Sequence, residues 1–527
     1  MSVDTNNAAF QDALNLIQYT RQSVFLTGKA GTGKSTFLRY VCEHTKKKYV
    51  VLAPTGIAAI NAGGSTMHSF FKLPFYPLLP DDPNLSLQRG RIHEFFKYTK
   101  PHRKLLEQIE LVIIDEISMV RADIIDAIDR ILRVYSHNLR EPFGGKQLLL
   151  VGDVFQLEPV VKNDEREILN RFYPTPYFFS ARVFGQIDLV SIELQKVYRQ
   201  TDPVFVGVLD HIRTNTAGAA DLQLLNTRYG SQIEESEADM YITLATRRDT
   251  VDSINEKKLA ELPGESITFE GVIEGDFPES SLPTSQELVL KPGAQIIFIK
   301  NDFDRRWVNG TIGVIAGIDE EEETIYVITD DGKECDVKRD SWRNIRYRYN
   351  EKTKEIEEEV LGSFTQYPIR LAWAITVHKS QGLTFSRVVI DFTGGVFAGG
   401  QAYVALSRCT SLDGIQLKKP INRADIFVRP EIVNFAGRFN NRQAIDKALK
   451  QAQADVQYAA AARAFNKGDM EECLEQFFRA IHSRYDIEKP VPRRLIRRKL
   501  GIINTLKEQN KKLKEQMREQ IGRASCR

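Results

Sequence analysis

Short apolar runs alternate with segments of helical spacing in the first third of the chain. The strand-like runs are Ser23–Thr27, Tyr49–Ala53, Leu111–Asp115 and Leu148–Asp153. The segments of helical character between and around them are Phe10–Thr20, Thr36–His44, Ile92–Gln108 and Asp123–Tyr135. Strands that are apolar on both faces and alternate with helices are typical of a parallel sheet covered on both sides. The pattern therefore predicts an α/β fold.

The same alternation returns later in the chain, but two segments interrupt it. Parallel-strand character is found at Leu189–Leu194, Met240–Ala245, Ile369–Thr376 and Val388–Asp391. Leu73–Gly90 contains four prolines, which predicts an inserted surface excursion. Between the second and third of those strands lie short β runs separated by Gly, Asp and Glu clusters: Gln295–Lys300, Thr311–Ile315, Thr324–Thr329 and Asn344–Tyr349. Such spacing predicts a small β-barrel inserted in a second α/β unit.

After Arg438 the chain reads as mostly helical. Ala459–Ile481 resembles one helical hairpin of the tetratricopeptide type. Arg484–Gln520 carries 12 Lys/Arg against 5 Asp/Glu, a local charge of 12 − 5 = +7. This basic segment either holds a DNA duplex or a partner, or is a solvated helical face. Its apolar 3/4 spacing is short for a coiled coil. Residues 521–527 break the helical pattern and are interpreted as a sequence scar.

Composition excludes several classes of protein. The 72 Lys/Arg and 70 Asp/Glu leave a formal charge of +2, so any basic surface for nucleic acid must be local. No apolar run reaches the ~20 residues that span a bilayer, and we expect no membrane partner. The five cysteines lack paired spacing, which argues against a disulfide scaffold and fits a reducing cytosol. We therefore expect a cytoplasmic protein, in a bacterial cytosol or nucleoid.

The clearest chemical signal is Gly28-Lys-Ala-Gly-Thr-Gly-Lys34-Ser35, which matches the phosphate-binding P-loop. Its glycines permit a tight loop with amides that point at phosphate, and the following helix adds its positive end. Lys34 is expected to reach the β/γ-phosphate oxygens, and Ser35 to hold Mg²⁺. The expected cofactors are therefore ATP and Mg²⁺.

Two further apolar strands deliver polar residues at their carboxyl ends, where ligands bind in open parallel sheets. Asp115 and Glu116 follow the third strand; Asp115 is expected to bind Mg²⁺, and Glu116 to act as general base on the attacking water. Gln156 follows the fourth strand and is expected to orient that water.

Taken in order, several motifs resemble those of PIF-type (petite integration frequency) DNA helicases of superfamily 1B, with RecD-type helicases as relatives. The resemblance covers about residues 1–440. Its motifs are Gly28–Ser35, Ala53-Pro-Thr-Gly-Ile-Ala-Ala59, Gly64-Ser-Thr-Met-His68-Ser-Phe70, Asp115-Glu-Ile-Ser-Met119, Gly152–Leu157, Tyr198-Arg199-Gln200, Thr376-Val-His-Lys-Ser-Gln-Gly-Leu-Thr384 and Tyr403-Val-Ala-Leu-Ser-Arg408.

The resemblance implies two RecA-like P-loop motor domains with parallel sheets. The first is expected at residues 1–180 with a wedge-like, proline-rich insertion at 69–105. The second is expected at 181–440 with an SH3-like β insertion at 295–362. A helical C-terminal domain would occupy 441–520. In the β insertion, Trp307 lies in Arg-Arg-Trp-Val-Asn-Gly; it is either an exposed ring for nucleic acid or part of a hairpin core.

The same resemblance assigns further residues to the nucleotide. Arg199 and Arg408 would touch the γ-phosphate as arginine fingers, although each alone would pass for a surface ion pair. Gln11 would contact adenine, in a poorly matched motif whose alternative is a plain helix-surface glutamine. The full set of expected ATP-binding residues is Gln11, Gly28, Gly31, Gly33, Lys34, Ser35, Thr36 and Gly382.

Single-stranded DNA is the partner that the resemblance implies, together with single/double-strand junctions. The expected DNA-binding residues are Thr55, Ser65, His68, Phe70, Thr376, His378 and Lys379. Small hydroxyls, imidazoles and one Lys in loops suit contacts to phosphates that ignore sequence. His68 is alternatively a structural histidine. Phe70, Phe71 and Phe75 either stack on bases or fill the core.

These inferences predict a monomeric ATP-dependent DNA helicase. Translocation from 5′ to 3′, and unwinding of G-quadruplexes or RNA–DNA hybrids, rest on the resemblance alone, as do roles in repair, recombination and telomere maintenance. Two alternatives remain: a P-loop ATPase that remodels proteins, and a nucleic-acid-binding adaptor switched by ATP without unwinding. ATPase activity that responds to single-stranded DNA separates the helicase from both.

Overall fold

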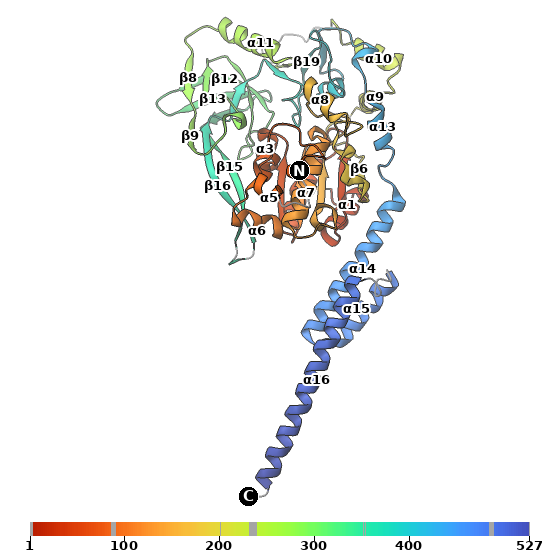
Figure 1. Cartoon of the computed structure of the whole chain (residues 1–527). Coiled ribbons are helices and arrows are strands. Elements are labelled where there is room, and N and C mark those ends of the chain that lie inside the picture. Colours follow the sequence, from red (N-terminus) through yellow and green to blue (C-terminus); the bar gives the residue numbers. More distant parts are fainter. Residues whose placement is uncertain are drawn as a thin grey trace. The chain divides into compact units, whose positions relative to one another are not determined.

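The computed structural model describes residues 4–85, 91–200, 202–230, 240–350, 352–353, 355–483 and 490–525 (Figure 1). The chain forms two compact units, Met1–Arg442 and Gln443–Arg527. The described helices are long enough for ordinary packing, but none is both long and apolar enough to cross a membrane.

A six-stranded parallel sheet, in the order β3-β2-β4-β5-β1-β6, organises the region that we call the first lobe. Its strands are β1 (Val24–Gly28), β2 (Tyr49–Ala53), β3 (Ser65–Thr66), β4 (Leu111–Ile114), β5 (Gln147–Val151) and β6 (Val190–Leu194). Strands β1, β4 and β5 are buried along their whole length, as expected for a sheet covered on both faces. The main helices of this lobe are α1 (Ala8–Tyr19), α2 (Lys34–His44), α3 (Gly56–Ala62), α7 (Ala122–Tyr135) and α8 (Asn163–Leu169).

A four-stranded parallel sheet, in the order β18-β7-β19-β20, organises the second lobe. Its strands are β7 (Ile242–Ala245), β18 (Ala374–Thr376), β19 (Val388–Asp391) and β20 (Ile415–Leu417). The helices of this region are α9 (Pro203–Arg213), α10 (Ala219–Asn226), α11 (Arg248–Glu261) and α12 (Gln401–Leu406). The predicted α/β fold with parallel sheets is confirmed.

Strand β6 lies in the first lobe, whereas the sequence placed residues 189–194 at the start of the second motor domain. It pairs in parallel with β1, with Val190 opposite Val24. The chain also returns to this lobe after the second one, because Phe435 on α13 (Pro430–Ala436) packs with Phe25 and Phe178. Hydrophobic pairing across long sequence separations therefore sets this boundary, and local patterning does not reveal it.

The β insertion contains a five-stranded antiparallel sheet, in the order β14-β13-β12-β11-β17. Its strands are β11 (Gln295–Phe298), β12 (Ile312–Asp319), β13 (Thr324–Thr329), β14 (Glu334–Val337) and β17 (Ile369–Leu371). The expected single strand at 369–376 is thus wrong: β17 pairs antiparallel with β11, and β18 pairs in parallel with β7. Trp307 is buried and stacks on Phe298 at 4.4 Å between ring centroids, which confirms the core alternative.

A long hairpin links the insertion to the first lobe. Strands β15 (Asp340–Asn350) and β16 (Glu355–Gln366) pair with each other, and β9 (Val272–Gly275) adds a third strand. A separate pair consists of β8 (Ile267–Glu270) and β10 (Glu287–Leu290). Tyr347 and Tyr349 of β15 are buried in the core of the first lobe, and the Tyr347 hydroxyl accepts a hydrogen bond from Val51 N at 3.4 Å. The hairpin therefore ties the β insertion to the edge of the first sheet.

The proline-rich segment is anchored by side chains. Leu73, Leu78 and Leu85 are buried in the first lobe's core; residues 86–90 lie outside the described part. The helix expected at 92–108 is wrong as one element, because it is divided into α5 (Arg91–Phe96) and α6 (Lys100–Gln108). Lys97 adopts a left-handed φ of 34°, which a continuous helix does not permit. Helix α4 (Met67–Phe71) precedes the segment.

The second compact unit is helical. It comprises α14 (Arg442–Lys467), α15 (Met470–Ser483) and α16 (Pro490–Ser525). Helices α14 and α15 form a hairpin whose turn contains Gly468, at a φ of 84° that favours glycine. Tyr458 and Phe477 pack edge to face across the hairpin, with ring centroids 5.9 Å apart.

Candidate active site

The P-loop joins β1 to α2, as the motif requires. Gly31 and Gly33 have φ values of 80° and 91°, a conformation that only glycine adopts freely. A side chain on Gly31 would collide with Arg199, so the loop passes close to the segment that leaves the first lobe. The Lys34 ammonium donates to the carbonyl oxygens of Gly28 at 2.7 Å and Lys29 at 3.0 Å. The Lys34 ammonium group is therefore bound to carbonyl oxygens of the P-loop itself.

Two carboxylates follow β4 at the same end of the sheet. Burial raises the pKa of Asp115, whose Oδ1 accepts a hydrogen bond from Glu116 N at 2.9 Å. Burial and the adjacent Asp115 raise the pKa of Glu116 to about 7, while Lys34 opposes that rise. A carboxylate with a pKa near neutrality is well matched to act as a general base.

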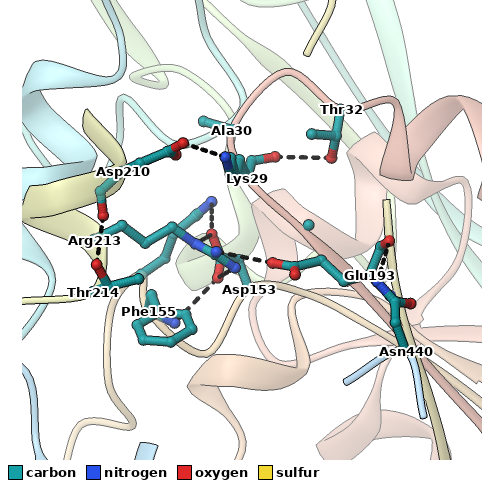
Figure 2. A network of polar contacts seen from close by, with 12 residues as sticks. Lys29, Ala30, Thr32, Asp153, Phe155, Glu193, Asp210, Arg213, Thr214 and Asn440 are labelled. Atoms are coloured by element: carbon teal, nitrogen blue, oxygen red, sulfur yellow. Dashed lines mark hydrogen bonds and ion pairs between the residues drawn. The ribbon is translucent and has the colours of Figure 1, made fainter. Parts of the chain in front are cut away.

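The loop that carries Gln156 is joined to the second lobe by an ion-pair network of Asp153, Arg213 and Glu193 (Figure 2). The Gln156 backbone N–H donates to Asp153 O at 2.9 Å. The Asp153 carboxylate accepts two hydrogen bonds from Arg213, with Arg213 Nη2 3.1 Å from Oδ1. Arg213 also pairs with Glu193 at 2.8 Å, and its guanidinium lies 4.4 Å from the Phe155 ring centroid. Because Arg213 ends α9, the second lobe supports the loop that carries Gln156.

The guanidinium groups of Arg199 and Arg408 both donate hydrogen bonds to backbone carbonyl oxygens within residues 404–407. Arg199 Nη1 donates to Ser407 O at 3.2 Å. The Arg408 guanidinium is fully buried and donates to carbonyl oxygens that include Val404 O at 3.0 Å and Ser380 O at 3.3 Å. Burial, then the proximity of Arg199, lowers the pKa of Arg408 to about 9. Within the described residues, neither arginine has a carboxylate oxygen at ion-pair distance, and the more distant Glu116 and Asp153 attract the charge of Arg408.

The two lobes meet at the P-loop. Ala30 N donates to the Tyr403 hydroxyl at 3.0 Å, and Lys29 pairs with Asp210 on α9. Gly400 has a φ of 79°, and a Cβ there would collide with the backbone carbonyls of Phe155 and Gln156. Hence α12, which leads to Arg408, sits directly on the loop that carries Gln156.

A cavity of about 340 Å³ opens beside this junction and is lined by both lobes. Its lining includes residues of the first lobe, Ser35, Thr55, Asp115 and Glu116, and residues of the second lobe, His378, Lys379 and Gly382. These seven are sequence-predicted residues that the structure brings together. Ser35 and Asp115 offer a hydroxyl and a carboxylate, oxygen ligands of the kind that Mg²⁺ prefers. The donor set therefore fits a magnesium ion.

The expected DNA-binding residues are distributed over both lobes. Thr55 caps α3 by accepting from Ala58 N at 3.2 Å, and Thr376 accepts from Lys379 N at 3.2 Å. Ser65 is buried in β3. The His68 ring stacks on Phe75 at 5.0 Å, and burial lowers the pKa of His68.

The aromatic residues of the region separate clearly by exposure. Phe70 is only 4% exposed and packs edge-on against Phe71, 4.8 Å between centroids. Its ring face is therefore not available to a base, which corrects the expected DNA contact. Phe75, by contrast, is 85% exposed.

Other expected residues lie outside the cavity lining. Gln11 is on α1, where its Nε2 donates to Thr5 O at 2.7 Å. Thr36 is in the first turn of α2. Gly28, Gly31, Gly33, Lys34, Gln156, Arg199 and Arg408 occupy the adjoining junction of P-loop and second lobe described above.

Four residues of this region were not predicted from the sequence. Tyr403 and Gln381 stand inside motifs already recognised, and the Gln381 amide nitrogen is buried without a partner among the described residues. Arg370 lines the cavity, and burial lowers its pKa to about 10. Arg213 carried no signal, because a basic residue in the last turn of a helix is ordinary dipole pairing.

The family model described as PIF1-like helicase matches residues 4–207. The ATP-dependent DNA helicase Pif1 of Bdellovibrio bacteriovorus is 31% identical over 439 residues, covering 81% of this chain and 90% of that protein. A crystal structure of Bacteroides sp Pif1 with ADP-AlF4 matches with a TM-score of 0.76 and 42% identity, over 83% of this chain and 97% of that one. Bacteroides Pif1 bound to single-stranded DNA matches with a TM-score of 0.60 and 41% identity, over 84% and 99%.

Proposed function

The chain belongs to the PIF1-like helicase family and is an ATP-dependent DNA helicase, and from that premise we propose how its residues divide the work. The two lobes act as motor domains that close on ATP and reopen after hydrolysis. Each lobe holds DNA phosphates, and alternation of the two grips moves the strand. The proline-rich segment acts as the wedge at the junction.

The P-loop lobe binds the nucleotide. Lys34 exchanges its carbonyl partners for β/γ-phosphate oxygens, and the amides at Gly28, Gly31 and Gly33 face phosphate. Gln11 and Gly382 contact the nucleotide, and Thr36 adds a hydroxyl in the first turn of α2. Ser35 and Asp115 would hold Mg²⁺, whose chemistry there would be to neutralise charge on the phosphates.

Hydrolysis requires residues of both lobes. Glu116 accepts a proton from the attacking water, and Gln156 orients that water. Arg199 and Arg408 leave their backbone carbonyls for the γ-phosphate when the lobes close. The observation that carries this proposal is the pair of cationic guanidiniums without carboxylate partners beside the P-loop and Glu116. An uncompensated buried charge is costly, and a phosphate would compensate it.

The DNA strand runs over loops of both lobes. Thr55, Ser65 and His68 contact it on one side, and Thr376, His378 and Lys379 on the other. Arg370 adds a further cation, and the exposed Phe75 ring, in place of Phe70, stacks on a base. By family resemblance the direction is 5′ to 3′, and G-quadruplexes and RNA–DNA hybrids are substrates.

The test of the motor is ATPase activity with and without single-stranded DNA, with Lys34→Ala as the control for contaminating activity. We expect strong stimulation by DNA that Lys34→Ala abolishes. ATP turnover that ignores DNA would instead identify a remodelling ATPase, and DNA binding without turnover would identify a switched adaptor. Strand displacement on 5′-tailed against 3′-tailed duplexes then decides the polarity.

A further inference from the structure

Helix α16 carries a row of apolar side chains that no other described element covers. Its upstream part packs on α14, where the Lys499 ammonium lies 5.0 Å from the Phe465 ring centroid. Further along, Leu506, Leu513 and Met517 are 58%, 59% and 61% exposed. In Figure 1 α16 continues as a single helix past the α14–α15 hairpin of the same unit.

The row has the period of a two-stranded coiled coil. Ile503, Leu506, Asn510, Leu513 and Met517 are separated by 3, 4, 3 and 4 residues, the a/d spacing of a heptad. This places Ile503, Asn510 and Met517 at a positions and Leu506 and Leu513 at d positions. A β-branched residue at a with leucine at d favours dimers, and one polar Asn at an a position fixes register and oligomeric state.

Charges beside the row specify the orientation of a second helix. The e positions are Lys507 and Lys514, and the g positions are Gln509 and Gln516. An antiparallel pair, in which e positions flank e positions, would oppose Lys507 to Lys514 of the other helix. A parallel pair in register opposes Gln509 to Lys514 instead, so no like charges face each other, and the two Asn510 amides meet.

We propose that α16 forms a parallel, in-register coiled coil with α16 of a second copy of this chain. The apolar row is the contact surface, and Asn510 sets the register. This departs from the monomer expected from the sequence. Because Arg497, Arg498 and Lys499 precede the row in both copies, their repulsion opposes association, and added salt screens it. Dimerisation through α16 is therefore expected to strengthen as salt is added. Association of two copies through a shared contaminating DNA molecule would instead weaken as salt is added.

Sedimentation equilibrium of the full chain tests the surface. We expect a concentration-dependent dimer whose dissociation constant rises at least about 100-fold in Leu506→Ala/Leu513→Ala. Alanine keeps the helix, and Thr505→Ala/Glu515→Ala changes outward c and f positions as the matched control. Asn510→Leu should tighten association and admit species above the dimer. A monomer at every concentration, or equal dimerisation by the two double variants, overturns the proposal.

Cysteine cross-linking tests the orientation. With the partly exposed Cys42 and Cys473 and the terminal Cys526 replaced by serine, Met517→Cys in a parallel pair meets its counterpart and forms an intermolecular disulfide upon oxidation. In an antiparallel pair an a position packs against a d position, so the two Met517→Cys side chains lie apart along the helix axis. Thr505→Cys at an outward position is the control for random collision. Efficient cross-linking of Met517→Cys alone supports the parallel pair. Equal yields from both variants contradict it.

Discussion

The nucleotide cleft and helix α16 both contain several arginines, but two arginines of the cleft are buried, whereas the described arginines of α16 are exposed to water. In the cleft, Arg213 and Arg408 are buried, one against two carboxylates and the other against backbone carbonyls. On α16, Arg497 and Arg498 are exposed to water. The comparison teaches that burial, together with the partner present or missing, distinguishes a cation with a defined task from one that supplies general charge.

The two buried arginines also differ from each other. Arg213 is paired with Asp153 and Glu193, so it joins the two lobes in this conformation. Arg408 has only uncharged acceptors among the described residues, so it keeps an unused capacity for an anion. One arginine supports the structure, and the other is the one that we propose to bind the γ-phosphate.

Loss of Arg408 is the largest expected effect. Arg408→Ala should lower kcat of the DNA-stimulated ATPase by about 10³–10⁵-fold, because an arginine finger stabilises charge in the transition state. ATP binding, measured with a fluorescent nucleotide, should change far less. Arg497→Ala on α16 is the matched control and should leave kcat unchanged. A kcat within tenfold of the parent would remove Arg408 from the mechanism.

Loss of Arg213 should act on stability first. Arg213→Gln leaves the buried Asp153 and the partly buried Glu193 without their cation, and breaking a buried pair in this way typically costs about 3–5 kcal/mol. Denaturant unfolding of the nucleotide-free chain measures this loss. Glu193→Gln/Arg213→Gln should recover part of it, because one uncompensated carboxylate is then removed. A single variant as stable as the parent would show that the network does not hold the lobes.

The pH dependence of kcat/KM for ATP should report Glu116 in the free enzyme. Its pKa is raised to about 7, and only the deprotonated carboxylate accepts a proton. The value of kcat/KM should therefore fall about tenfold for each pH unit below about 7 and level off above it. Glu116→Gln should remove this slope along with most activity. A parent profile that is flat across neutral pH would contradict the assigned base.

The exposed arginines give the smallest expected effect. Arg497→Gln/Arg498→Gln should change the free energy of unfolding by no more than about 0.5 kcal/mol, as is usual for surface substitutions. The same unfolding measurement applied to Arg213→Gln provides the contrast. Destabilisation of comparable size in both variants would erase the distinction between buried and exposed cations.

Local motifs predicted the part of the site that is local in the chain. The P-loop and Asp115–Glu116 each combine an apolar strand with the residues that follow it, so neighbouring sequence defines both the structure and the chemistry. Strand β13 at Thr324–Thr329 was also predicted at its observed bounds. In these places the signal needs only a few adjacent residues.

Contacts between segments that are distant in the chain could not be predicted from local sequence patterns. Strand β16 reads Glu-Ile-Glu-Glu-Glu-Val at its start, so its charge conceals a strand that is ordered by pairing with β15. Phe70 and Phe75 are indistinguishable by type, and only packing buries one and exposes the other. Arg213 acquires its role from Asp153 and Glu193, which are remote in sequence.

The central claim is that arginines from outside the P-loop complete the hydrolytic centre. The most direct measurement is a structure of this chain with ADP, Mg²⁺ and AlF4⁻. We expect the guanidiniums of Arg199 and Arg408 to have left Ser407 O and Ser380 O and to lie within hydrogen-bond distance of fluoride. Guanidiniums that keep those carbonyl partners while the nucleotide is bound would contradict the account.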